Sequence, residues 1–71
     1  MADESKKVLS EAAQAVVMAI GRERNAVEFY SYLAETVTIS KASEFFERMA
    51  QRELEDMEEL ELFLAKLNKK K

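Results

Sequence analysis

The chain has 71 residues, of which 48% are hydrophobic and 35% charged, with a net charge of −3; this length allows one domain. It contains no Cys, no Pro, no His and one Gly, which excludes disulfides and thiolate chemistry. The scarcity of turn formers leaves little room for β-hairpins or sandwich loops, and the abundant Ala, Leu, Glu, Lys and Met favour helices. We therefore predict an all-α fold.

The sequence argues against a membrane and against nucleic acid as partners. The opening MADESKK has no apolar segment of a secretory signal behind it, and no apolar run approaches the ~18 residues of a membrane span. The basic run 69–71 is too short to indicate nucleic-acid binding. We expect a cytoplasmic protein that contacts neither membrane nor nucleic acid.

Residues 1–71 are predicted to form one helical hairpin. The first helix is expected at about residues 4–36, with Asp3 or Ser5 as its N-cap. The β-branched and hydroxylated segment TVTIS, residues 36–40, interrupts the helix formers. A second helix, capped by Ser40 or Thr38, is expected at about residues 40–68. The short link predicts that the two helices are antiparallel.

Each predicted helix carries acidic residues within its apolar stripe when it is projected at about 100° per residue. Glu23 lies at the centre of the first stripe, between Ile20 and Val27. Glu53 lies near the centre of the second stripe, and Asp56 shares that stripe. Neighbouring acids of the same run project to the opposite, solvent side: Glu55, Glu58 and Glu59.

A two-helix hairpin is too small to enclose stripes of this width. Two hairpins can enclose them by packing into a four-helix bundle, so we predict a homodimer. Its two-fold axis would bring both copies of Glu23, Glu53 and Asp56 towards one layer. The first helix also carries apolar side chains on its outer side, which favour association into a higher oligomer: Met18, Phe29 and Tyr32.

Six inward carboxylates cannot all remain charged and unpaired, because burial and mutual repulsion both disfavour the ionised form. They could hold a cation, share protons, or bend out towards water and arginine; Arg52 lies one turn before Asp56. Carboxylate oxygens suit iron, Mn, Mg and Ca. Tyr30 lies two turns after Glu23, where its hydroxyl could donate to a metal-ligand carboxylate of the partner helix.

Two segments resemble the rubrerythrin branch of the ferritin-like superfamily. AIGRERNAVEFYSYLAE, residues 19–35, is similar to the first ligand helix of that branch, with Glu23 at the ligand position. FFERMAQRELEDM, residues 45–57, is similar to the second, with Glu53 at the ligand position. The two segments together span about half of the residues of the two predicted helices. A single hairpin of this kind is also similar to encapsulated ferritins, which build their site across a dimer interface.

The resemblance implies a ferritin-like four-helix bundle with a di-iron carboxylate site that oxidises ferrous iron or reduces peroxide. Its metal ligands would be Glu23, Glu53 and Asp56, with Tyr30 donating to one of them from outside the ligand shell. One position departs from the family, which has Glu-x-x-His where this chain has Glu53 and Asp56. An all-oxygen site shifts the preference towards harder cations such as Mn, Mg or Ca.

Three functional hypotheses follow. The first is a homodimeric ferritin-like metal-binding protein with ferroxidase or peroxidase-like oxidoreductase activity. The second is a degenerate bundle without redox activity that acts as a structural or interaction module, which the missing His favours. The third is a helical adaptor that presents Met18, Phe29 and Tyr32 to another protein.

Overall fold

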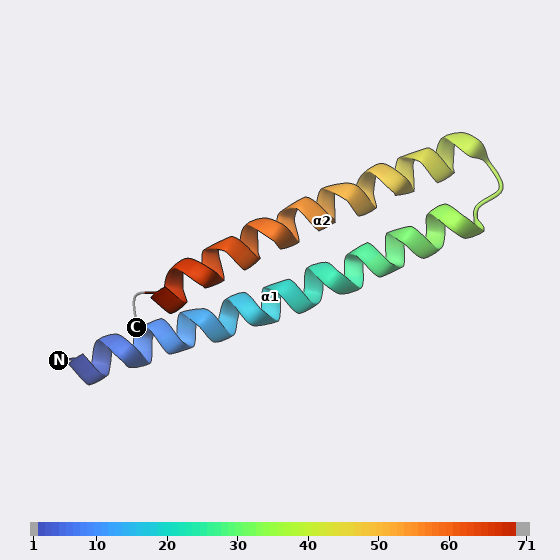
Figure 1. Ribbon diagram of the computed structural model, residues 1–71. Coiled ribbons are helices and arrows are strands. Elements are labelled where there is room, and N and C mark those ends of the chain that lie inside the picture. The colour runs from blue at the N-terminus through green and yellow to red at the C-terminus, as the bar shows by residue number, and fades with distance from the viewer. Residues whose placement is uncertain (1, 70–71) are drawn as a thin grey trace.

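A computed structural model describes the backbone of residues 2–69 and the side chains of residues 10–69. Two helices, α1 (Ala2–Thr36) and α2 (Ser40–Lys69), account for nearly all of this part of the chain, and it contains no strand. The prediction of an all-α fold is therefore confirmed. Figure 1 shows the helices running antiparallel, with both chain ends at one end of the molecule and the turn at the other.

The helix bounds lie close to the predicted ones. α1 begins at Ala2 instead of about residue 4 and ends at Thr36, and α2 begins at Ser40 and ends at Lys69 instead of about residue 68. Some sequence predictions fall outside the described residues. These concern the side chains of Asp3 and Ser5, and the whole of Lys70 and Lys71.

The turn lies at residues 37–39, within the β-branched segment that interrupts the helix formers. The Val37 amide still donates to the Leu33 carbonyl at 3.0 Å, and the Ser43 amide donates to the Ile39 carbonyl at 3.0 Å. The Ser43 hydroxyl also donates to the Ala34 carbonyl at 2.7 Å. That bond joins the start of α2 to the end of α1, so it holds the two helices together at the turn.

The half of the hairpin near the chain ends holds an aliphatic core. Val16 and Ile20 of α1 pack with Leu67 of α2, each 9% exposed or less. The half near the turn holds aromatic side chains instead: the Tyr30 ring stacks on the Phe46 ring, with centroids 6.3 Å apart and an interplanar angle of 17°. No described side chain is completely buried, so the hairpin alone forms a thin core.

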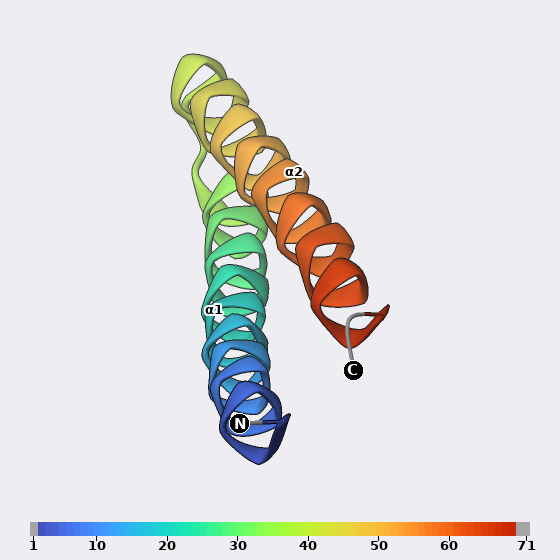
Figure 2. The same cartoon turned by 90° about the vertical axis from the view of Figure 1, so that its left-hand side faces the viewer.

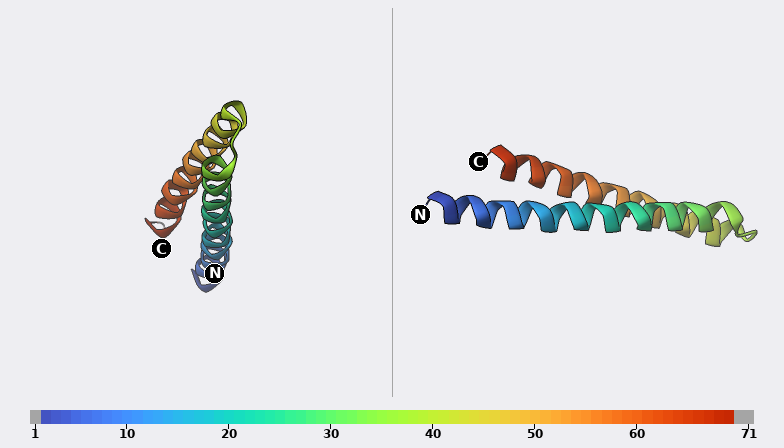
Figure 3. Two further views of the ribbon diagram at one scale, coloured as in Figure 1. Left: turned by 90° about the vertical axis from the view of Figure 1, so that its right-hand side faces the viewer. Right: turned by 90° about the horizontal axis from the view of Figure 1, so that it is seen from below.

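The hairpin is long and narrow, with principal extents of 58 × 14 × 10 Å. Figures 2 and 3 show that the two helices are inclined to each other. Within residues 2–69, neither helix is long and apolar enough to cross a lipid bilayer.

Candidate metal centre

The first candidate ligand, Glu23, lies near the middle of α1 on the face that packs against α2. It follows Ile20 by three residues and precedes Val27 by four, which is the spacing of neighbours on one helix face. Ile20 is buried, and Glu23 and Val27 are half-buried. The carboxylate of Glu23 therefore stands within an apolar stripe, as the projection predicted.

The other two candidate ligands lie on α2. Glu53 and Asp56 are three residues apart, so they lie one turn apart on the same side of the helix. Glu53 is half-buried, whereas Asp56 is exposed on the isolated hairpin. The neighbouring acids Glu55, Glu58 and Glu59 are exposed, as predicted for the solvent side.

The structure brings Glu23, Glu53 and Asp56 together, and we call these three residues the acidic trio. Each offers one carboxylate oxygen, and the three oxygens lie within 4.8 Å of one another. The antiparallel register explains this meeting. Tyr30 lies opposite Phe46, so stepping seven residues back along α1 and seven forward along α2 places Glu23 opposite Glu53.

The trio raises the pKa of the Glu23 carboxyl above its ordinary value of 4.5. The main cause is a side-chain hydrogen bond with Glu53, followed by partial burial and by the negative charges of Glu53 and Asp56. The Arg22 guanidinium opposes this rise as the smallest of the causes. The balance of charges around Glu23 is therefore unfavourable to its ionised form.

One oxygen of Glu23, Oε2, is buried and has no hydrogen-bond partner among the described residues. Glu53 cannot act as the partner while both carboxyl groups are ionised, because neither then carries a hydrogen. A hydrogen bond forms between them once one of the two is protonated. A buried acceptor without a partner is costly. A proton or a cation placed among the three oxygens would satisfy it.

The surroundings of the trio differ on its two sides along the hairpin. Towards the turn lies the stacked pair of Tyr30 and Phe46, with Phe29 5.6 Å from the Tyr30 ring. Towards the chain ends lie Met57 and Leu60, which pack on the aliphatic core. Tyr30 is half-buried, and its hydrogen bond to a carboxylate of a second hairpin stays a prediction.

The donor set fits a hard cation. All three ligand atoms are carboxylate oxygens, which are the ligands that Mg, Ca and Mn prefer and that iron accepts in carboxylate sites. The chain has no His, so it provides no imidazole ligand. Exposed acidic groups are also common without an ion, so the buried Oε2 of Glu23 is what separates this group from an ordinary acidic surface.

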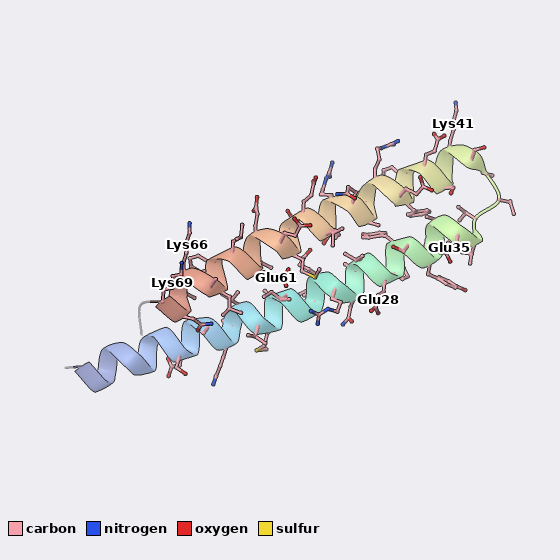
Figure 4. All side chains as sticks on the ribbon, viewed as in Figure 1. Glu28, Glu35, Lys41, Glu61, Lys66 and Lys69 are labelled. Carbon is pink, nitrogen blue, oxygen red and sulfur yellow. The ribbon has the colours of Figure 1, made fainter. Side chains whose placement is uncertain are left out.

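The charged side chains of the outer surfaces take no part in the trio. Figure 4 shows Glu28 of α1 and Lys41 of α2 pointing away from the opposite helix. Lys66 and Lys69 lie in the last turn of α2, where cations favour the helix dipole. These residues belong to the solvated faces.

The sequence interpretation missed a groove of about 320 Å³ between the helices. Small side chains leave it open, among them Ser31 and Ala34 of α1 and Ala50 of α2. At about 100° per residue, these positions fall on the flank of the hairpin away from Asp56. The facing small residues could have indicated the groove, but the relative register of the helices was needed to place them opposite one another.

Comparisons of this chain with protein-family models, with curated proteins and with solved structures give no significant match. The case for a metal centre therefore rests on the geometry and electrostatics of the acidic trio. The hairpin supplies three candidate ligands for such a centre.

Proposed function

We propose that this chain is a ferritin-like carboxylate metal-binding protein whose site forms across a homodimer of hairpins. The observation that carries the proposal is the acidic trio, with three carboxylate oxygens within 4.8 Å of one another and a buried Glu23 oxygen that lacks a partner. A divalent cation would neutralise the charges that raise the Glu23 pKa. The resemblance of residues 19–35 and 45–57 to rubrerythrin ligand helices points to the same residues.

A second hairpin is needed because three ligands leave most of a cation's coordination positions open; Ca takes about 6–8 oxygens and Mg demands an octahedron. Two hairpins related by a two-fold axis would supply twice the trio. That number of carboxylates suits two cations, as in di-iron carboxylate bundles.

The uncovered side of the hairpin next to the trio supports this dimer. At about 100° per residue, several apolar side chains fall on the same flank as Glu23 and Asp56. Phe45 and Phe63 of this flank are 49% and 51% exposed. We call this surface the carboxylate flank, and it comprises Ala19, Ala26, Leu33, Phe45, Met49 and Phe63.

The residues of the trio have distinct roles in this proposal. Glu23 and Glu53 are the inner ligands, because both are half-buried. Asp56 is exposed and shorter than the His of the family pattern, so it binds as a weaker ligand or through water. When bound, two iron ions would supply the electrons for reduction of dioxygen or peroxide; Mn, Mg or Ca would leave a site that is structural.

A second function, a degenerate bundle that acts as a structural or interaction module without redox activity, is favoured by the Asp at position 56 and the lack of His. The two candidates differ in metal dependence. The degenerate bundle keeps its melting temperature when chelator is added, whereas the metal-binding protein loses the stabilisation that its metal provides.

The test measures binding of Fe²⁺ under anaerobic conditions, and of Mn²⁺ and Ca²⁺, by calorimetry and by metal analysis. We expect at least one cation to bind wild-type protein and to stabilise it by about 2.7 kcal/mol at a hundredfold excess over Kd. Glu53→Gln should abolish this binding, and Glu58→Gln on the solvent side should leave it unchanged. Asp56→His should shift the preference towards Fe²⁺, because imidazole is a softer ligand.

Two results would contradict the proposal. One is that none of these cations binds the wild-type protein. The other is that Glu53→Gln and Glu58→Gln reduce binding equally, which would indicate general attraction of cations to an acidic surface. Air admitted to the Fe²⁺-loaded protein then tests redox activity separately, through the absorbance of oxidised iron.

A further inference from the structure

The side of the hairpin opposite the carboxylate flank carries two hollows that the proposed metal site does not use. One is the groove of about 320 Å³ near the turn, which Ser31 and Ala50 line. The other, of about 490 Å³, lies nearer the chain ends, where Ala13 and Leu64 line it. At about 100° per residue, Ala13 and Ser31 fall at the same angle around α1, so one hollow follows the other along the hairpin. We call this side the groove flank, and it comprises Ala13, Val17, Ser31, Ala50 and Leu54.

The length of the groove flank indicates an elongated occupant. Ala13 and Ser31 are 18 residues apart, which is about 27 Å along a helix. The floor of the groove near the turn is made of half-buried apolar or small side chains, such as Val27, Ala50 and Leu54. Small side chains at a helix contact allow a short distance between helix axes. The shape therefore fits a third helix laid along the hairpin, which is a recurring mode of peptide recognition.

The rims of the groove flank are acidic. We consider the described residues 22–61 and the sector between about 60° and 140° from the direction of Glu23 and Glu53 on each helix. On this side the sector holds one basic residue, Arg24, and five acidic residues, all exposed. Two of these acids line the groove itself, Glu35 from α1 and Glu47 from α2. The five acids are Glu28, Glu35, Glu47, Glu58 and Glu61.

The charges of the carboxylate flank differ in sign and balance. The same sector on that side, within residues 22–61, holds four basic and two acidic residues. A two-fold contact brings the same surface of two copies together, so on the groove flank it would place acidic rims against acidic rims. The charges therefore argue against a second copy there and favour a partner of opposite charge. The six residues of the carboxylate side are Arg22, Lys41, Arg48, Arg52, Asp56 and Glu59.

We propose that the groove flank is the docking surface for a basic amphipathic helix of another protein. A stripe of small and apolar side chains on that helix fills the two hollows. Lys or Arg along both borders of the stripe pairs with the acidic rims, as charged residues beside the apolar seam of a coiled coil do. The groove flank lies away from Asp56, so a dimer formed through the carboxylate flank leaves it open, and docking does not require metal.

The test uses a synthetic peptide as the probe. It is an amidated helical peptide of about 21 residues, or about 31 Å, with Ala and Leu on one stripe and Lys along both borders. A matched peptide carries Glu in place of every Lys. Calorimetry measures the binding of each peptide to the full chain in the presence of chelator, so that no cation at the acidic trio contributes.

Three variants separate the groove flank from general acidity. The double variant Glu35→Gln, Glu47→Gln removes two charges from the rims. Its matched control is Glu55→Gln, Glu59→Gln, which removes two exposed charges outside the groove flank. Ser31→Gln fills the groove near the turn without adding a charge. Gln is also a better helix former than Ser, so loss of helix cannot explain the effect of Ser31→Gln.

We expect the Lys peptide to bind the wild-type chain and the Glu peptide not to bind. The rim variant and Ser31→Gln should each weaken binding by at least about fivefold, and the control variant by less than about twofold, since scattered surface charges contribute little. The proposal is overturned if both peptides bind alike, if Ser31→Gln keeps the wild-type affinity, or if the two double variants weaken binding equally.

Sedimentation equilibrium of the chain without peptide tests the other occupant of the groove flank. Ser31→Gln should keep the wild-type mass. A lower mass would show that a second copy fills the groove, and this result would also overturn the proposal. Cation binding by Ser31→Gln is measured in parallel and should match wild type, so that failure of the metal site and failure of this docking surface are told apart.

Discussion

Among the described side chains, Glu23 combines a buried, unpartnered oxygen with an unfavourable set of neighbouring charges. Its position three residues after buried Ile20 places the carboxylate at the helix contact, where water cannot fully solvate both oxygens. Glu53 then adds a second carboxylate opposite it, and Asp56 adds a third. Folding therefore brings together charges that the unfolded chain keeps apart.

The metal-free protein should become more stable as the pH falls from 7 towards about 4.5 because of Glu23. Its pKa in the folded state lies above the ordinary value of 4.5, so the folded protein takes up a proton at a higher pH than the unfolded chain. The unfavourable contribution is complete above the folded-state pKa, decreases as the pH falls below that pKa, and is gone below the unfolded-state value of 4.5. Thermal melting with chelator, at a series of pH values, measures it.

Glu23→Gln should remove this part of the pH dependence, since the amide does not titrate. It should be more stable than wild type at pH 7, and the difference should shrink as the pH is lowered. Glu58→Gln, on the exposed side of α2, is the control and should follow the wild-type curve. Parallel curves for Glu23→Gln and wild type would show that the trio does not perturb Glu23.

At the scale of the helices, the turn determines which residues meet. The bond from the Ser43 hydroxyl to the Ala34 carbonyl, 2.7 Å long and partly buried, joins the first turn of α2 to the last part of α1. It fixes the axial offset of one helix against the other at the turn. Because both helices rise by the same distance per residue, this offset also places Tyr30 opposite Phe46. Farther along the hairpin it brings the acidic trio together.

Ser43→Ala should destabilise the hairpin by about 1 kcal/mol, the typical net value of one intramolecular hydrogen bond. A loss of this size lowers the melting temperature of a domain of 60–100 residues by about 4–8 °C. Circular dichroism melting measures the change. The control is Ser31→Ala, which removes a hydroxyl group at a position within α1. An equal loss of stability in Ser31→Ala would show that the Ser43 hydrogen bond is not the cause of the effect.

At the scale of the whole molecule, the hairpin exposes much of its apolar surface. Among the described side chains, Ala13, Val16, Ile20 and Leu67 are the buried hydrophobic ones, whereas Phe45 and Phe63 are about half exposed. Small domains without disulfides or metal often depend on a partner chain for stability. Stability of this chain should therefore be a property of the assembly more than of the single hairpin.

The melting temperature should rise with protein concentration. Each tenfold increase stabilises a dimer by about 1.4 kcal/mol relative to its unfolded chains. Phe63→Glu should weaken this dependence and reduce cation binding, because Phe63 lies on the carboxylate flank. Its sequence neighbour Leu62, 67% exposed, provides the control Leu62→Glu, which should retain both properties. A wild-type melting temperature independent of concentration would contradict the dimer.

The sequence by itself determined the two helices, the position of the turn and the side of each helix on which an acid lies. Three local properties of the sequence determine them: the helix formers, the β-branched and hydroxylated residues 36–40, and the spacing around Glu23 and Glu53. Each residue turns a helix by about 100°, so the spacing of two residues gives the angle between their side chains.

The tertiary structure decided which acids meet, which oxygen is buried and how far Asp56 remains exposed. Helical periodicity specifies the angle of a side chain about the axis of its helix. It does not specify the axial offset or the inclination between two helices. Those two quantities arise from contacts between residues distant in the sequence, such as Ser43 with Ala34 and Tyr30 with Phe46. For that reason the trio could be proposed from the sequence, while its distances required the packed hairpin.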